Sequence, residues 1–151
     1  AVKTSFCIGV AGYPEKHFEA PNMQTDLAFL KAKVDAGAEY VTTQMFFDNK
    51  KYFDFVQSCR DAGITVPIIP GLKPISTRKQ LTVIPRTFHV DVPEALSTEI
   101  LKCKTDADVE IVGTEWLLQQ SKELKAAGVP VLHYYTLGKP KMVCAVVKEI
   151  L

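Results

Sequence analysis

Apolar positions along the chain follow two spacings. Short runs rich in Val, Ile, Thr and aromatic residues are typical of strands, whereas apolar residues three or four positions apart are typical of helices. This pattern predicts four strands, at residues 5–11, 40–47, 66–70 and 131–137. It predicts six helices, at residues 21–37, 50–62, 76–84, 92–102, 106–127 and 140–151.

Glycines mark the ends of three predicted helices. The sequence Asp-Ala-Gly occurs at residues 35–37 and 61–63, Ala-Ala-Gly occurs at 126–128, and each glycine is followed by an apolar residue that leads into a strand. Glycine closes a helix readily, so these are helix ends that feed parallel strands. We therefore expect an α/β fold of repeated (β/α) units of barrel type, with the helices on one side of the sheet.

The composition indicates one globular domain over residues 1–151. The chain has 47% hydrophobic and 23% charged residues, with a net charge of +1 and no basic block. We therefore expect no nucleic-acid partner and, since no apolar run approaches about 20 residues, no membrane partner. The chain starts without Met or a signal-peptide pattern and enters a strand almost at once, so we expect a piece of a longer protein.

The four cysteines are too far apart to indicate a metal site or a disulfide framework. They are Cys7, Cys59, Cys103 and Cys144, with no Cys-x-x-Cys pair and no histidine in ligand register. We expect all four to be buried free thiols in a reducing compartment, which favours a cytoplasmic location.

Polar residues follow the first strand, at the end where parallel strands carry ligand sites. Tyr13 offers a stacking plane and a hydroxyl group, and His17 offers a donor near neutral pH. On the first helix, Asp26 and Lys33 lie seven residues apart, hence on one face and roughly 10 Å from each other. They could hold the two ends of an elongated ligand. On the sequence alone, however, an ordinary polar surface is the better interpretation of all four residues.

Alternation along the second strand places Thr42, Gln44 and Phe46 on one face and the more apolar set on the helix side. Gln44 would then lie on the inner face at the C-terminal end of the strand. Its amide can donate and accept at once, as a pterin or amide edge requires. A glutamine satisfied by neighbouring backbone explains the pattern equally well.

Motifs for familiar chemistry do not occur. The sequence contains no glycine-rich phosphate loop, no Gly-x-Ser-x-Gly and no His-Glu-x-x-His. Four carboxylates lack any pairing pattern for acid–base work: Glu15, Glu19, Asp48 and Glu115. The residues alone therefore define no mechanism.

Five segments together resemble the methylenetetrahydrofolate reductase family. They are AGYPE at 11–15 with His17, KAKVDAGA at 31–38, TQMFFD at 43–48, IIPGLKPI at 68–75 and HYYTL at 133–137. The resemblance implies a (β/α)8 TIM barrel with FAD that reduces 5,10-methylenetetrahydrofolate to 5-methyltetrahydrofolate with NAD(P)H. Residues 1–151 would be the C-terminal half of this catalytic barrel.

The resemblance also assigns residues to ligands. Those expected near FAD are Tyr13, His17, Ala20, Asp26 and Lys33, with Lys33 near the phosphates and Ala20 in contact through its backbone. Gln44 is expected to serve both nicotinamide and folate, and Gln80 to contact folate.

Some positions depart from the family pattern. Phe29 and Ala32 stand where polar or basic residues are common, and Lys139 replaces an arginine near the folate. Lysine keeps the charge but loses the bidentate fork. The family's general-acid glutamate and an aspartate that tunes the flavin belong to strands before Ser5. We therefore expect no catalytic residue in this chain and no turnover by the chain alone.

Other interpretations remain open. The chain could be a non-catalytic module that binds flavin or folate, or a different barrel enzyme, because the architecture does not fix the chemistry. It could also be a structural half barrel that forms a homo-oligomer, because parallel sheets are normally covered on both faces.

Overall fold

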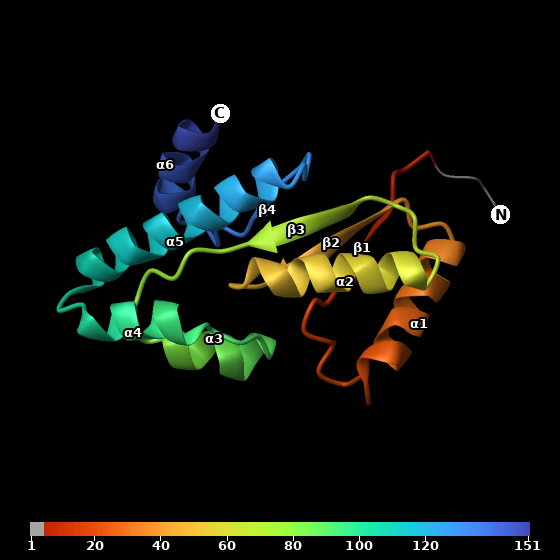
Figure 1. Ribbon diagram of the computed structural model, residues 1–151, viewed down its shortest axis with the longest axis horizontal. Coiled ribbons are helices and arrows are strands. Elements are labelled where there is room, and N and C mark those ends of the chain that lie inside the picture. Colours follow the sequence, from red (N-terminus) through yellow and green to blue (C-terminus); the bar gives the residue numbers. More distant parts are fainter. Residues whose placement is uncertain (1–4) are drawn as a thin grey trace.

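A computed structural model describes residues 5–151 and contains one four-stranded sheet. The strands are β1 (Gly9–Gly12), β2 (Tyr40–Met45), β3 (Ile68–Leu72) and β4 (His133–Tyr134). All neighbours are parallel and the strand order follows the chain, as Figure 1 shows. The predicted α/β fold with a parallel sheet is therefore confirmed.

Helices link the strands and cover one face of the sheet. They are α1 (Met23–Asp35), α2 (Asn49–Asp61), α3 (Gln80–Phe88), α4 (Glu94–Lys102), α5 (Asp106–Ala126) and α6 (Lys141–Ile150). One core joins Val41 and Leu72 of the sheet to Leu30 of α1, Leu117 of α5 and Val146 of α6, with α2 packed beside them. The predicted placement of helices on one side is thus confirmed.

A second core lies beyond the C-terminal end of β3. Here α3 and α4 lie side by side below the start of α5 (Figure 1), and Ile84 and Ile100 pack with Phe47 and Ile75. This second core supports the long connection between β3 and β4. No helix in the part that the structure describes is long and apolar enough to cross a membrane.

The helix boundaries follow from local chemistry. Side chains of Asn22, Asp48 and Thr105 accept hydrogen bonds from backbone N–H groups in the first turns of α1, α2 and α5, as capping residues do. After each of these helices stands one glycine with positive φ: Gly37, Gly63 and Gly128. The three glycine helix ends predicted from the sequence are therefore confirmed.

The strands differ from the prediction in length and position. β1 begins at Gly9 rather than residue 5, and β4 has two residues instead of seven. β3 runs through Pro70-Gly71 to Leu72 instead of ending at residue 70. Pro70 lacks an N–H, and the pairing of β2 with β3 shifts between Thr42 and Met45. The shift lets Gly71 N–H donate to Thr43 Oγ1 at 2.9 Å.

The helix expected at 76–84 instead spans Gln80–Phe88. The helix begins after Lys79 with no side-chain cap, and the backbone N–H of Ser76 donates to Gln80 Oε1 at 2.7 Å. Pro85 lies inside the helix, which ends only at His89, where φ is 54°.

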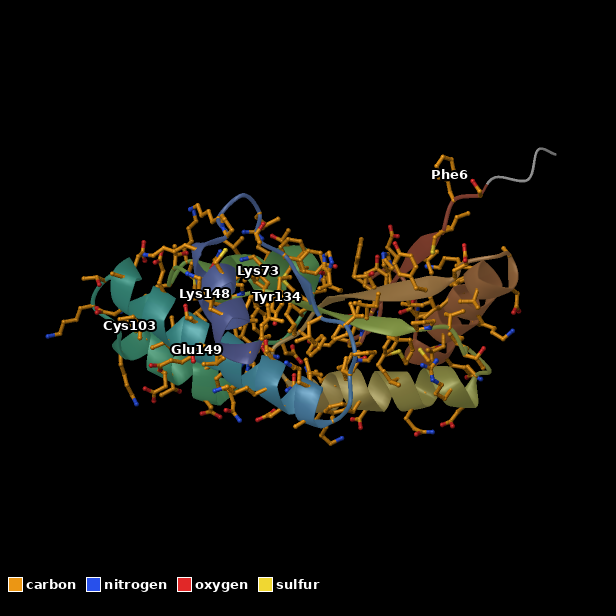
Figure 2. The ribbon with its side chains drawn as sticks, turned by 90° about the horizontal axis from the view of Figure 1, so that it is seen from above. Phe6, Lys73, Cys103, Tyr134, Lys148 and Glu149 are labelled. Atoms are coloured by element: carbon orange, nitrogen blue, oxygen red, sulfur yellow. The ribbon has the colours of Figure 1, made fainter. Side chains whose placement is uncertain are left out.

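The prediction that the thiols are buried is wrong for two of the four cysteines. Cys59 and Cys103 are buried, but Cys7 and Cys144 are exposed, and all four are free. Cys7 precedes β1 in an uncovered segment, next to Phe6, which projects from the body of the molecule (Figure 2). Cys144 lies on the solvent side of α6, opposite its buried apolar residues.

Candidate functional site

A pocket of about 260 Å³ lies between the β1–α1 loop and helix α1. Its walls bring together the five residues that the resemblance assigned to FAD: Tyr13, His17, Ala20, Asp26 and Lys33. Glu19 and Phe29 complete the lining, and Phe29 gives the pocket an apolar wall. The structure thus gathers the five residues at the C-terminal end of β1, where parallel sheets carry ligands. Their contact with FAD stays a prediction.

The loop of this pocket is held in place by polar contacts. Asp26 Oδ2 accepts a hydrogen bond from the backbone N–H of His17 at 2.8 Å, which ties the loop to α1. Lys16 has a φ of 74°. Its ammonium group donates to the carbonyl oxygens of His17 at 2.8 Å and Ala20 at 2.6 Å. Only one oxygen of Asp26 serves the loop, so Oδ1 is able to accept from a ligand.

The pocket combines a neutral phenol, two aromatic rings in contact and an exposed lysine. Burial, and then the negative charge of Asp26, raise the pKa of Tyr13, so its phenol stays neutral and able to donate. The Tyr13 and His17 rings meet edge to face, with centroids 4.6 Å apart. Lys33 lies exposed at the rim and donates to the carbonyl of Ala11 at 3.3 Å.

Gln44 is half-buried near the end of β2, and its Oε1 accepts from the backbone N–H of Met45 at 3.0 Å. The oxygen is therefore satisfied by backbone in this structure, which is the alternative that the sequence left open. We predicted that Phe46 shares the inner face of the sheet with Thr42, and this prediction is wrong. Phe46 stacks on Tyr52 of α2 at 5.4 Å, because β2 ends at Met45 and the alternation stops there.

A second pocket, of about 340 Å³, opens between the β3–α3 loop, the β4–α6 loop and α5. Gln80 lines it together with Lys73, Lys139 and Tyr135. Tyr135 lies over Gly71, where a side chain would clash with its ring, and donates to the carbonyl of Thr43 at 2.9 Å. Burial, and then the nearby Tyr13, raise the pKa of Tyr135.

Sequence reasoning missed a partly buried ionic contact beside the first pocket. Glu15 Oε2 accepts from the Lys51 ammonium and from the backbone N–H of Asp91 at 3.0 Å, and Lys51 also pairs with Asp91. Burial raises the pKa of Glu15 although the charge of Lys51 opposes this. The contact holds the α3–α4 connection against the β1–α1 loop. The same two segments also meet where the ring of His89 stacks on the ring of Phe18, with centroids 4.8 Å apart. No local signal predicts it, because Lys51 and Asp91 are 36 and 76 residues from Glu15.

Lys73 was also missed, since the sequence offers only its place in an apolar loop. It is 7% exposed, and its Nζ donates to the carbonyl of Pro74 at 3.1 Å. Parallel (β/α) units with two pockets at the C-terminal ends of the strands define an α/β protein whose pockets lie where such folds carry ligands.

Comparison with known proteins gives the family. The family model for methylenetetrahydrofolate reductase matches residues 1–151, so the chain belongs to the methylenetetrahydrofolate reductase family. Predicted from five short segments, this membership is confirmed.

The curated relatives are longer than this chain. A 5,10-methylenetetrahydrofolate reductase of Salmonella typhimurium is 41% identical over 142 residues, covering 93% of this chain and 48% of that protein. A probable methylenetetrahydrofolate reductase (NADPH) of Caenorhabditis elegans is 37% identical over 147 residues, covering 96% of this chain and 22% of that protein. The chain thus spans half or less of the length of the relatives it matches.

A solved structure shares the fold. An uncharacterized protein from Clostridium thermocellum, which binds two copies of 5-methyl-5,6,7,8-tetrahydrofolic acid, superposes with a TM-score of 0.62. The match covers 94% of this chain and 52% of that protein at 18% identity, so it supports the fold alone.

Proposed function

We propose that this chain is the C-terminal half of the (β/α)8 barrel of an FAD-dependent reductase, forming a single domain over residues 1–151. The parent enzyme would reduce 5,10-methylenetetrahydrofolate to 5-methyltetrahydrofolate with NAD(P)H, in cytoplasmic one-carbon metabolism and methionine biosynthesis. Family membership supports the reaction. The observation that carries the proposal for this chain is that one pocket gathers five residues matched to the family's cofactor site.

The donors of this pocket suit a flavin dinucleotide. The Lys33 ammonium would neutralise phosphate, Asp26 would accept from ribose hydroxyls, and Tyr13 and His17 would offer aromatic faces and donors. Ala20 is buried, so its contribution would come from the backbone. A volume of about 260 Å³ lies below the roughly 300–1,000 Å³ of typical ligand pockets. The pocket would therefore hold part of the cofactor, as half of a site should.

Two glutamines would serve the substrates. The half-buried Gln44 would turn its amide toward the nicotinamide or the folate, and Gln80 would contact folate from the second pocket. Tyr13, His17, Ala20, Asp26 and Lys33 would hold FAD, which would supply hydride-transfer chemistry between the nicotinamide and the folate. The residues of this chain would only bind and orient.

We further propose that the 151 residues alone do not turn over. The sheet has four strands, so β1 and β4 each keep one unpaired edge among the described residues, and Ala11 is exposed on the face opposite the helices. An assay of NAD(P)H oxidation with menadione or methylenetetrahydrofolate should give no rate above the uncatalysed background. A clear rate would overturn this part of the proposal.

Binding of flavin tests the proposed site directly. Fluorescence titration should show that Lys33→Met weakens FAD binding about tenfold while riboflavin, which has no phosphate, is unaffected. Lys31→Met is the matched control, because Lys31 lies on the same helix, pairs with Asp35 and does not line the pocket. Equal loss in both variants, or equal effects on FAD and riboflavin, would contradict the assignment of Lys33.

A second candidate function is a structural half barrel that self-associates. It is favoured by the sheet face opposite the helices, where Thr42, Gln44 and Ile69 are only half-buried. Sedimentation velocity should then give a mass of two chains or more. A monomer at all concentrations would exclude it.

A further inference from the structure

Lys73 is a buried cation that the proposed flavin site does not use. It follows the last residue of β3 and lies within the group of helices α3, α5 and α6 (Figure 2). Only 7% of the residue is exposed, and its one hydrogen bond runs to the carbonyl of Pro74. An ammonium group removed from water at this depth is costly unless an opposite charge accompanies it.

The described residues supply no such counter-charge. Among residues 5–151, no ion pair involves Lys73 or Lys139. Burial, and then the charge of Lys139, lower the pKa of Lys73. The second pocket contains a third lysine, Lys141, and one carboxylate, Glu110, which is already bound to Lys141 at 3.3 Å. The pocket therefore holds an excess of positive charge around a buried ammonium.

The remaining lining of this pocket suits a carboxylate. Hydroxyl groups come from Ser76, Thr77 and Thr136, and the pocket has a volume of about 340 Å³. Gln80, the residue expected to contact folate, lines the same cavity. A ligand that reaches Gln80 therefore comes within the space that Lys73 and Lys139 share.

We propose that Lys73 binds a carboxylate of the folate's glutamate tail and thereby selects the acidic form of the substrate. Lys139 adds a second positive charge at the mouth of the pocket, where it is exposed. This inference rests on the proposed folate function. It makes Lys73 a specificity residue in addition to Gln44 and Gln80.

Calorimetric titration of the 151-residue chain tests the inference. The two probes are 5-methyltetrahydrofolate and the same compound with both glutamate carboxylates converted to amides. The unaltered chain should bind the acid about tenfold to a hundredfold more tightly than the diamide, as expected for a charged hydrogen bond. Lys73→Met should remove this preference without weakening the diamide.

Lys148→Met is the matched control, because Lys148 is exposed on α6 and does not line the pocket. It should keep the full preference for the acid. Lys73→Met should melt no lower than the unaltered chain, since methionine fills a similar space without a buried charge, so binding and folding can be separated. A preference for the acid that survives in Lys73→Met would overturn the inference while leaving folate binding intact. Failure of both probes to bind would refute the folate-binding role proposed for this chain, and the inference with it.

Discussion

Gly113, in the middle of α5, is the position where a single methyl group should perturb the structure most. A Cβ atom at Gly113 would lie 1.9 Å from the carbonyl oxygen of Ile75. Ile75 follows Lys73 and Pro74 in the loop that lines the second pocket. Replacing Gly113 with alanine therefore pushes the helix and this loop apart.

Two effects of opposite sign compete in Gly113→Ala. Alanine favours the helix by about 1 kcal/mol relative to glycine. The clash is with a backbone atom, and ordinary contact begins near 3.4 Å, so the loop or helix must shift by about 1.5 Å (3.4 minus 1.9). Overpacking of this kind costs about 1–3 kcal/mol, and occasionally more. The shift is large and neither atom belongs to a flexible side chain, so we expect a net loss of about 2 kcal/mol.

Thermal and urea unfolding measure this loss. For a chain of 151 residues, about 2 kcal/mol lowers the Tm by about 4–8 °C. Glu115→Ala, on the exposed side of the same helix, is the control and should change the Tm little. If Gly113→Ala is as stable as the unaltered chain, or more stable by the helix term, the close approach of α5 to the loop is wrong.

Two further predictions concern buried polar contacts around α2. Tyr52 donates to the carbonyl of Ile68 at 2.8 Å, and burial raises its pKa from 10.0 to about 12. Because the pKa of Tyr52 is higher in the folded state, its contribution to the free energy of unfolding is present below pH 10 and is lost as the pH rises toward 12. Tyr52→Phe should therefore lower the free energy of unfolding by about 1 kcal/mol at neutral pH. Urea unfolding at pH 8 and pH 11 should show that the variant loses less stability than the unaltered chain as the pH rises. Lys51→Met removes the cation that pairs with the half-buried Glu15, so it should cost about 1–3 kcal/mol in the same assay. Lys50 is an exposed lysine paired within its helix, so Lys50→Met should change little. A reversed order of the two lysine variants would contradict the role of Glu15.

Most of the fold could be predicted because its signals are local. Caps such as Asp48 and the glycine at 63 mark helix ends within a few residues, and strand and helix periods distinguish the repeated units. The closeness of the residues that line the first pocket was predictable for the same reason, since they lie on one loop and the helix that follows it. The assignment to FAD came from the family resemblance, because Asp26 and Lys33 by themselves fit an ordinary charged surface.

The errors come from interactions between distant segments. Phe46 turns to the helix side because β2 stops where its pairing with β3 shifts beside Pro70. Lys73 is buried in a loop that α5 approaches closely at Gly113. Glu15 accepts a hydrogen bond from the backbone of Asp91, which lies 76 residues away in the sequence. Pattern along the chain carries no information on such contacts, since each depends on how complete elements pack.

The most direct test of the central claim is a chemical-shift map of the 151-residue chain titrated with FAD. The largest backbone shifts should fall on Tyr13, His17, Ala20, Asp26 and Lys33, while α4 and the start of α5 stay unchanged. Weak binding would still be visible, since half of a cofactor site needs only millimolar affinity to shift these signals. Absence of any shift at millimolar FAD, or shifts concentrated on helices away from the β1–α1 loop, would contradict the flavin pocket proposed for this chain.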